Sequence, residues 1–373
     1  MNNNIRVGNL FGIPFFINPS WFLVLGLVTL SFGGQLAGFP QLSGLVPWIL
    51  GLITALLLFA SVLAHELGHS AAAIQQGISV KSITLFIFGG LASLERESKT
   101  PGEAFLVAIA GPLVSLLLFG LFTILALTTG VSGPLAVIIN LLASINLVLA
   151  LFNLLPGLPL DGGNILKALV WKVTGNPYKG VVFASRVGQF FGWLAVMVGG
   201  LAILGISPVG SFWTLLIGFF LLQNAGFSAQ SANLQDKLNN LTAADAVIPN
   251  SPVISADLNL REFANNYVIG NGKWRKFLVT NEAEQLIGTV VVDDMKLVST
   301  SLWPETSIQE VMKSTAETIT VNARQSLLEV VQLLEQKEVQ QLPVISENGT
   351  VVGLLEKASI MSLLQKQGQT NPA

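Results

Sequence analysis

Long apolar segments with very little charge make up most of the first 228 residues of this 373-residue chain, and they constrain its fold more than any other feature. The run from Leu45 to Ala64 contains no Asp, Glu, Lys or Arg. A helix needs about 20 apolar residues to cross the hydrocarbon core of a bilayer. Segments of this kind predict a multi-pass α-helical membrane protein with about six transmembrane helices. They are Trp21–Phe39, Leu45–Ala73, Phe105–Thr128, Leu135–Leu155, Ala184–Ile206 and Phe212–Phe227.

The charged residues divide the chain near residue 228. Residues 1–228 hold 8 basic and 5 acidic side chains, and residues 229–373 hold 11 and 16, so the two parts carry formal charges of +3 and −5. The sparse charge of the first part is typical of a membrane domain, and the second part resembles an ordinary soluble domain in composition. We therefore predict a membrane domain over residues 1–228 and a linker over 229–241, followed by a soluble module.

The basic residues of the membrane domain predict its orientation. If the N-terminus is cytoplasmic and the chain crosses six times, every one of them falls in a cytoplasmic segment: Arg6, Lys81, Arg96, Lys99, Lys167, Lys172, Lys179 and Arg186. This distribution follows the positive-inside rule. We therefore expect a multi-pass protein of a prokaryotic cell membrane with cytoplasmic N- and C-termini. A cleavable signal is not expected, because Pro14, Asn18 and Pro19 interrupt the first apolar run.

The two histidines of the chain, His65 and His69, lie four residues apart in the second apolar segment. Four residues make about one helical turn, so both imidazoles face the same side of a helix. Glu66 completes H-E-x-x-H, the spacing of a zinc hydrolase site in which the glutamate is the general base. A carboxylate in mid-membrane costs a few kcal/mol and is therefore a candidate functional residue. The chain has no cysteine, so His, Asp and Glu are the candidate ligands.

Asp161 is the candidate for a third ligand, since catalytic zinc usually takes three protein ligands. It lies in Asn-Leu-Leu-Pro-Gly-Leu-Pro-Leu-Asp-Gly-Gly, residues 153–163, directly after the fourth apolar segment. The prolines end the helix, and the glycines permit close backbone approach. A broken helix of this kind can direct a carboxylate into a cavity within the membrane. The alternative is that Asp161 caps a helix over residues 162–173; the missing third ligand favours the metal-binding interpretation.

Residues 1–228 resemble the site-2 protease family of intramembrane zinc metalloproteases. This family carries H-E-x-x-H on one transmembrane helix and N-x-x-P-x-x-P-x-D-G on a later one, in the order found here. The resemblance implies one zinc ion per chain, bound by His65, His69 and Asp161, with Glu66 as catalytic base. It also implies that Asn153 contributes to the substrate site.

Smaller motifs agree with this resemblance, with two departures. Phe88-Gly89-Gly90 and then Ala110-Gly111-Pro112 follow the first motif in the expected order. Asn164 stands where the family commonly has arginine, and Ser115 stands where it often has asparagine. We expect neither of these two residues to contact a metal ligand.

Residues 80–94 are too short to span a bilayer and are rich in β-branched and aromatic side chains. They predict a β-hairpin at the membrane edge with its turn at Gly89 and Gly90. The edge of this hairpin could pair with an extended substrate strand, so Gly89 and Gly90 are candidate substrate-binding residues. A helical peptide bond is hidden by its own hydrogen bonds and must be unwound before water attacks. The alternative is a re-entrant loop with a structural role.

Residues 242–301 and 306–366 read as two copies of one α/β unit, followed by a flexible end over 367–373. Each copy has a helix, a strand, a turn and a second strand, and Gly288 and Gly353 occupy equivalent positions. The pair resembles a tandem cystathionine-β-synthase (CBS) module, which in many proteins binds an adenine nucleotide and regulates an attached domain. Asp294 matches an acidic ribose contact of that family. The alternative is a structural or dimerisation module without a ligand.

Taken together, these features predict an intramembrane zinc-dependent endopeptidase that acts in regulated intramembrane proteolysis, with the CBS module as its regulator. The expected substrate is a membrane-anchored protein in the lipid bilayer, such as an anti-sigma factor or a signal-peptide remnant. A homodimer through the CBS module is compatible with the sequence, and no nucleic-acid partner is expected. A CBS-regulated channel or transporter is the alternative, but it leaves H-E-x-x-H and Asp161 unexplained. An inactive relative acting as a scaffold would not need the complete ligand set.

Overall fold

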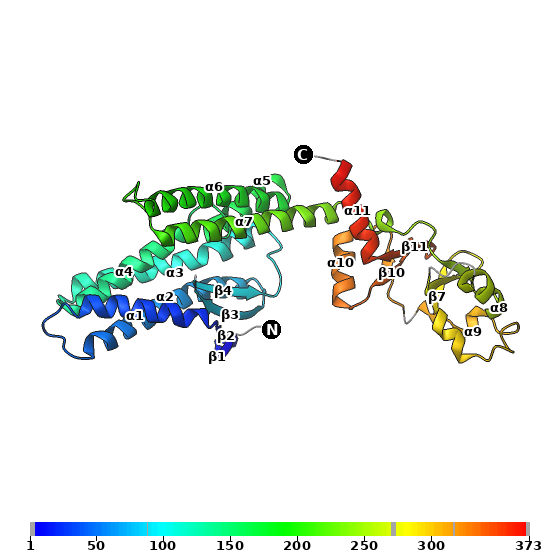
Figure 1. Ribbon diagram of the computed structural model, residues 1–373, viewed down its shortest axis with the longest axis horizontal. Helices are drawn as coiled ribbons and strands as arrows, with labels where there is room; N and C mark the ends of the chain where they lie inside the picture. The colour runs from blue at the N-terminus through cyan, green and yellow to red at the C-terminus, as the bar shows by residue number, and fades with distance from the viewer. Residues whose placement is uncertain (1–3, 88, 270–273, 316–317, 371–373) are drawn as a thin grey trace. The chain divides into compact units, whose positions relative to one another are not determined.

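The computed structural model describes residues 4–87, 89–269, 274–315 and 318–370 (Figure 1). The chain divides into two compact units, residues 1–233 and 234–373. The division falls inside one helix, α7 (Phe212–Asn239), so most of the predicted linker over residues 229–241 is helical.

Long apolar helices make up most of the first unit. Among the described residues, five helices are long and apolar enough to cross a membrane: α2 (Val46–Gln75), α3 (Pro101–Thr128), α4 (Pro134–Asn153), α6 (Pro177–Ile203) and α7. The first predicted span forms α1 (Ser20–Leu36), whose 17 residues reach about 25 Å, less than the roughly 30 Å of a hydrocarbon core. The multi-pass character is confirmed, while the count of six spans stays a prediction.

A four-stranded sheet packs beside these helices. Its strands, in order across the sheet, are β1 (Ile5–Leu10), β2 (Ile13–Ile17), β3 (Val80–Phe86) and β4 (Gly89–Leu94). β1 and β2 are antiparallel, β2 and β3 are parallel, and β3 and β4 are antiparallel. One face of the sheet packs against α2 through an apolar cluster formed by Ile13, Phe15, Trp21, Phe59, Val62, Ile83 and Leu85. β4 is therefore an edge strand next to the helix that carries both histidines.

The predicted hairpin over residues 80–94 forms as β3 and β4, but its turn lies earlier than expected. Gly89 and Gly90 pair with Phe86 and Leu85 and so begin β4. Gly89 has a φ of 135°, a conformation that favours glycine. Phe88, the first residue of the predicted Phe-Gly-Gly motif, lies outside the described residues.

The chain leaves the membrane helix α4 through a compact break at residues 154–160 and then forms α5 (Asp161–Thr174). Leu160 is the N-cap residue of α5, and Asp161 is its first helical residue, so Asp161 does not occupy the cap position. A Cβ atom on Gly162 or Gly163 would collide with the backbone of residues 154–158. These glycines allow the break to fold tightly against the start of α5, which fixes where Asp161 lies.

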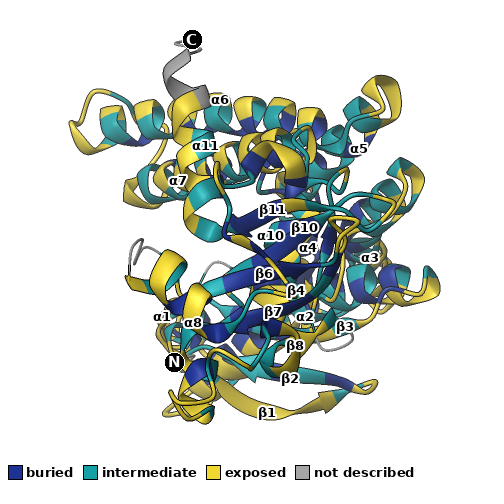
Figure 2. Cartoon of the chain, turned by 90° about the vertical axis from the view of Figure 1, so that its right-hand side faces the viewer, coloured by how far each residue is buried: buried dark blue, intermediate teal, exposed yellow. Residues whose placement is uncertain are grey.

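The second unit contains two sheets. The first consists of β5 (Val253–Ser255), β6 (Lys276–Thr280), β7 (Leu286–Val291) and β8 (Lys313–Ser314), in that order. The second has the order β11 (Val351–Glu356), β10 (Gln341–Ile345) and β9 (Val321–Asn322). Its helices are α8 (Leu260–Phe263), α9 (Ile308–Val311), α10 (Leu327–Gln336) and α11 (Lys357–Thr370). In Figure 2 the inner strands β6 and β10 are coloured as buried.

The two halves of this unit exchange their leading segments. Ala243 and Ala246, at the start of the first half, are buried in the apolar core of the second half. Ile308, at the start of the second half, is buried in the core of the first half, and β8 pairs with β7. Gly353 likewise packs against Val247 and Ser251 from the first segment. The predicted repeat boundaries at residues 242–301 and 306–366 stay a prediction, and the packing joins the two halves across them.

Candidate metal centre

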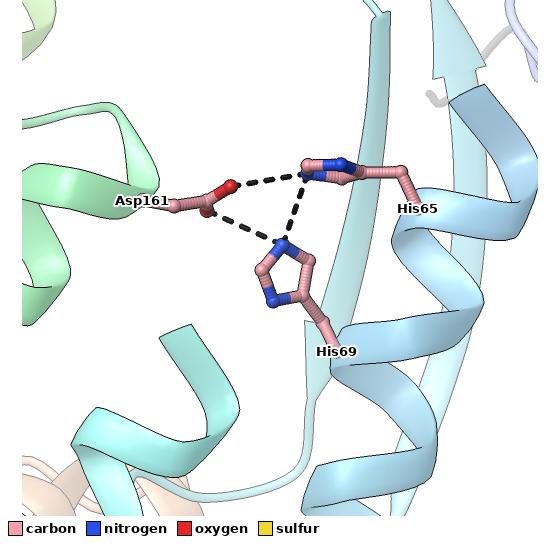
Figure 3. Close-up of side chains that lie close together, drawn as sticks. All are labelled: His65, His69 and Asp161. Atoms are coloured by element: carbon pink, nitrogen blue, oxygen red, sulfur yellow. Dashed lines mark hydrogen bonds and ion pairs between the residues drawn. The ribbon is translucent and has the colours of Figure 1, made fainter. Parts of the chain in front are cut away.

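Three side chains that could hold a metal ion converge at the junction of α2 and α5. His65 and His69 project from one face of α2, as their spacing predicts, and Asp161 reaches them from the start of α5 (Figure 3). Nε2 of His65 lies 3.0 Å from Oδ2 of Asp161, and Nε2 of His69 lies 3.3 Å from Oδ1. The side chains are largely buried, with exposed fractions of 4% for His65, 12% for His69 and 16% for Asp161. Their ligand atoms all lie within 4.8 Å of one another.

The hydrogen bonds of His69 favour a cation between these ligand atoms. Nδ1 of His69 lies 2.7 Å from the carbonyl oxygen of Val107. A carbonyl oxygen only accepts, so Nδ1 donates, and Nε2 of the neutral ring carries a lone pair. This lone pair faces the carboxylate of Asp161 and the Nε2 atom of His65 at 3.3 Å. Two nitrogen ligands of a tetrahedral zinc, each about 2.0–2.1 Å from the metal, are about 3.3–3.4 Å apart, so the residues fit zinc.

The ring of His65 is held from α3. Its Nδ1 atom lies 2.8 Å from Oγ of Ser115, which is fully buried. The expectation that Ser115 contacts no metal ligand is therefore wrong. The contact joins residues 50 positions apart, so helical periodicity could not reveal it. A hydroxyl in an apolar helix, three residues after the Gly111-Pro112 pair, was the available signal, because a buried hydroxyl needs a partner.

Gly111, also on α3, leaves space for the two imidazoles. A Cβ atom at this position would lie 2.7 Å from Nε2 of His65 and would also collide with the ring of His69. Any larger residue would therefore displace the rings from their present positions. Gly111 belongs to the Ala-Gly-Pro motif of the sequence, but the motif alone does not predict this role, since glycine in an apolar helix is usually explained by helix packing.

Glu66 belongs to α2, and its carboxylate lies next to the edge strand β4. A Cβ atom on Gly90 would be 2.9 Å from both Cδ and Oε1 of Glu66, so only glycine lets the strand approach the carboxylate this closely. The carboxylate and the three candidate metal ligands line one cavity of about 340 Å³. This arrangement brings a candidate general base next to the candidate metal site.

The other predicted substrate-site residues line the same cavity. Gly89 and Gly90 come from β4, and Asn153 comes from the end of α4, where its Nδ2 atom donates to the carbonyl oxygen of Leu149 at 3.0 Å. Asn164 of α5 also lines the cavity. The cavity thus has the backbone of β4 on one side and side chains of α5 on another.

Asp294, the predicted nucleotide contact, lies in the second unit. Its Oδ2 atom accepts a hydrogen bond of 2.8 Å from the backbone N–H of Val291, at the start of a short 3₁₀ helix. One carboxylate oxygen therefore has a structural partner. A role in nucleotide binding stays a prediction.

Comparisons with known families match both parts of the chain. The model of peptidase family M50 matches residues 53–137 and 118–199, which include both histidines, Glu66 and Asp161. The model of the CBS domain matches residues 308–366.

Relatives of this chain over almost its whole length agree with these family matches. A protein of Synechocystis sp. named as the zinc metalloprotease sll0528 is 63% identical over 98% of this chain and 96% of its own length. Rip3 of Mycobacterium tuberculosis, also named as a zinc metalloprotease, is 31% identical over 98% of this chain and 93% of its own length. The structure of a site-2 protease from Methanocaldococcus jannaschii is 26% identical and covers 61% of this chain and 95% of that one, with a TM-score of 0.44.

Proposed function

Because this chain belongs to peptidase family M50 and is a zinc metalloprotease with a CBS domain, we propose that it hydrolyses peptide bonds of membrane-anchored proteins. The observation that carries this proposal is the convergence of His65, His69 and Asp161 beside Glu66 on a membrane-capable helix. One zinc ion per chain is held by those three residues. Anti-sigma factors and signal-peptide remnants have the required topology, since both carry an apolar anchor.

The chemistry assigns distinct roles to the residues of the site. Zinc, when bound, supplies a Lewis acid that polarises a carbonyl oxygen and makes water more acidic. Glu66 takes a proton from the attacking water and delivers it to the nitrogen of the leaving amine. The apolar walls of α2 and α3 limit the access of bulk water, which strengthens these electrostatic interactions.

The substrate is proposed to bind as an extended strand along β4. β4 lies at the edge of its sheet, and Gly89, Gly90, Leu91 and Ala92 line the cavity. A peptide that pairs with this edge has its carbonyl groups exposed, whereas a helical peptide does not. Asn153 lies in the same cavity, where its amide oxygen is available to bind the substrate backbone. If the hairpin had only a structural role, the close approach of Gly90 to Glu66 would be unexplained.

The decisive experiment compares the wild type with Glu66→Gln on a membrane-anchored substrate in reconstituted vesicles. The variant is expected to retain zinc and to lose cleavage, because the amide cannot accept the proton. Glu95→Gln, an exposed residue outside the cavity, is the matched control and should cleave normally. Equal cleavage by the wild type and Glu66→Gln would overturn the proposal, and so would an inactive wild type that contains a full complement of zinc.

The third ligand is tested by zinc content. Asp161→Ala should purify with substoichiometric zinc, because two imidazoles remain where the site needs three ligands. Circular dichroism would establish that the helices are intact. If this variant keeps the zinc affinity of the wild type, Asp161 is not a ligand.

The second unit is proposed to act as a cytoplasmic regulatory module that binds an adenine nucleotide with the help of Asp294, and to dimerise. Calorimetry of the full-length protein with AMP and with ATP tests the nucleotide. Heat of binding that weakens in Asp294→Asn supports the proposal, and no heat at millimolar nucleotide would favour a structural module. Sedimentation of the detergent-solubilised protein tests the dimer.

The proposed orientation places Lys81 in the cytoplasm and Ser207 outside. The chain contains no cysteine, so single-cysteine variants at these positions need no prior removal of native thiols. A membrane-impermeant maleimide should label Ser207→Cys in intact cells and Lys81→Cys only after permeabilisation. The reverse pattern would invert the topology.

A further inference from the structure

One side of α5 lines the cavity from the candidate metal site outward. Asp161, Asn164, Lys167 and Trp171 all line the cavity, and their spacing of three, three and four residues places them along one helical stripe. Beginning at the metal ligand, this stripe faces the same space as the edge strand β4. A peptide lying along β4 would therefore pass the side chains of α5.

Lys167 is the cationic member of this stripe. Among the described residues that line the cavity, it is the only lysine or arginine. Its side chain is 16% exposed, and its Nζ atom lies 3.0 Å from Oε2 of Glu97. A lysine side chain that is mostly buried is stabilised by an anionic partner for its ammonium group.

The partner of Lys167 is much less constrained than Lys167 itself. Glu97 belongs to the segment between β4 and α3, and its side chain is 81% exposed. Moving this carboxylate into water changes its solvation little, because it is already largely hydrated. Lys167 is much less free to move into water, because its side chain is mostly buried where α5 lines the cavity. Another anion can therefore replace Glu97 at this position, while Lys167 stays at the cavity.

We propose that Lys167 determines substrate specificity by binding an acidic side chain of the substrate in place of Glu97. The inference rests on the proposed function and adds a substrate class to it. Both members of the Lys167–Glu97 pair line the cavity, so a bound peptide contacts the pair. Lys167 lies six residues after Asp161, about 9 Å along the helix axis. An extended peptide advances about 3.3 Å per residue, so the acidic residue lies about three residues from the cleaved bond.

The test is a charge scan of one membrane-anchored substrate in reconstituted vesicles. Glu, Gln or Lys is placed in turn two, three and four residues from the cleaved bond on each side. For the wild type we expect one position at which Glu exceeds Lys about tenfold or more in kcat/KM, mainly through KM. At that position Lys167→Glu should invert the preference, and Lys167→Gln should abolish it. Lys172→Glu, an exposed residue of the same helix outside the cavity, should keep the wild-type preference.

Glu97→Gln separates substrate recognition from a purely structural tie between α5 and the segment before α3. If Glu97 competes with the substrate, this variant should lower KM for the Glu substrate and leave zinc content unchanged. If the pair is only structural, Glu97→Gln and Lys167→Gln will reduce cleavage of all substrates equally, which would overturn the inference.

The failure of this inference and the failure of the proposed function give different results. A wild type that cleaves every substrate of the scan equally well contradicts the role of Lys167 and leaves the protease function intact. A zinc-loaded wild type that cleaves none of them contradicts both.

Discussion

Oγ of Ser115 lies 2.8 Å from Nδ1 of His65, on the side of the imidazole opposite to Asp161. One nitrogen of the ring thus meets a hydroxyl on α3, while the other faces the candidate metal position. A hydrogen-bond partner on the second ring nitrogen fixes the orientation of a histidine ligand.

Ser115→Ala is therefore expected to weaken zinc binding roughly 10–100-fold, because the ring loses the partner that orients it. Competition with a chelator of known affinity would measure the change in Kd. Ser70→Ala is the matched control, since Ser70 is equally buried but donates to the backbone oxygen of Glu66 within α2. Wild-type zinc affinity in Ser115→Ala would show that the contact does not support the metal site.

Gly111→Ala should abolish zinc binding with the fold retained. The added methyl group would occupy the space next to both imidazole Nε2 atoms, so the rings could no longer converge. Gly120→Ala on the same helix has open space around its Cβ position and should bind zinc normally. Zinc content and circular dichroism of both variants, measured in parallel, check this prediction. It fails if the two variants bind zinc equally well.

Gly90→Ala should lower kcat with little effect on zinc content. Its methyl group would push the carboxylate of Glu66 out of position, and a displacement of about 1 Å can reduce a rate roughly a hundredfold. Gly8→Ala in β1, where the Cβ position is open, controls for a general effect of alanine on the sheet. An unchanged kcat in Gly90→Ala would argue that Glu66 has another position during the reaction.

The lowered pKa of Lys276 should make the stability of the second unit depend on pH. Burial, and secondarily the charge of Lys313, lowers the pKa of Lys276 below its usual value, which is about 10.4. The folded state therefore binds this proton more weakly than the unfolded state, so the free energy of unfolding should increase as the pH rises through the folded-state pKa toward about 10.4.

Lys276→Met should stabilise the second unit at pH 7 and reduce this increase. Pulse proteolysis of the full-length protein in urea, at pH 7 and at pH 10, would measure both effects. Lys337→Met, at an exposed position after α10, should change neither. A destabilised Lys276→Met protein at pH 7 would contradict the sign of the prediction.

The convergence of His65, His69 and Asp161 could be anticipated from the sequence because its strongest signals are local. The spacing of His65 and His69 places them on one face of any helix, and the proline-rich break before Asp161 is visible in the residues themselves. Helix periodicity does not indicate which neighbouring helix meets which face. Ser115 and Gly111 both depend on how α3 packs against α2, so their roles emerged only from the three-dimensional arrangement.

Helix limits and the turn of the hairpin were less predictable for a different reason. Apolar composition continues past the end of α1, so it does not reveal that the helix stops at Leu36. Two successive glycines, such as Gly89 and Gly90, are typical of a turn. At Gly90 glycine is needed for a different reason, because a side chain there would collide with Glu66. In the second unit the repeated pattern predicted two strands in each copy, which form β6 with β7 and β10 with β11. The burial of Ile308 in the opposite half depends on contacts between the copies.

The exchange of leading segments in the second unit limits how such a module can be inherited. Because each half completes its core with a segment from the other, deletion of one half would leave apolar surface open in the half that remains. Recombination can therefore add or remove the module only as a whole. Once joined, the two copies are free to diverge in surface chemistry while neither can be discarded.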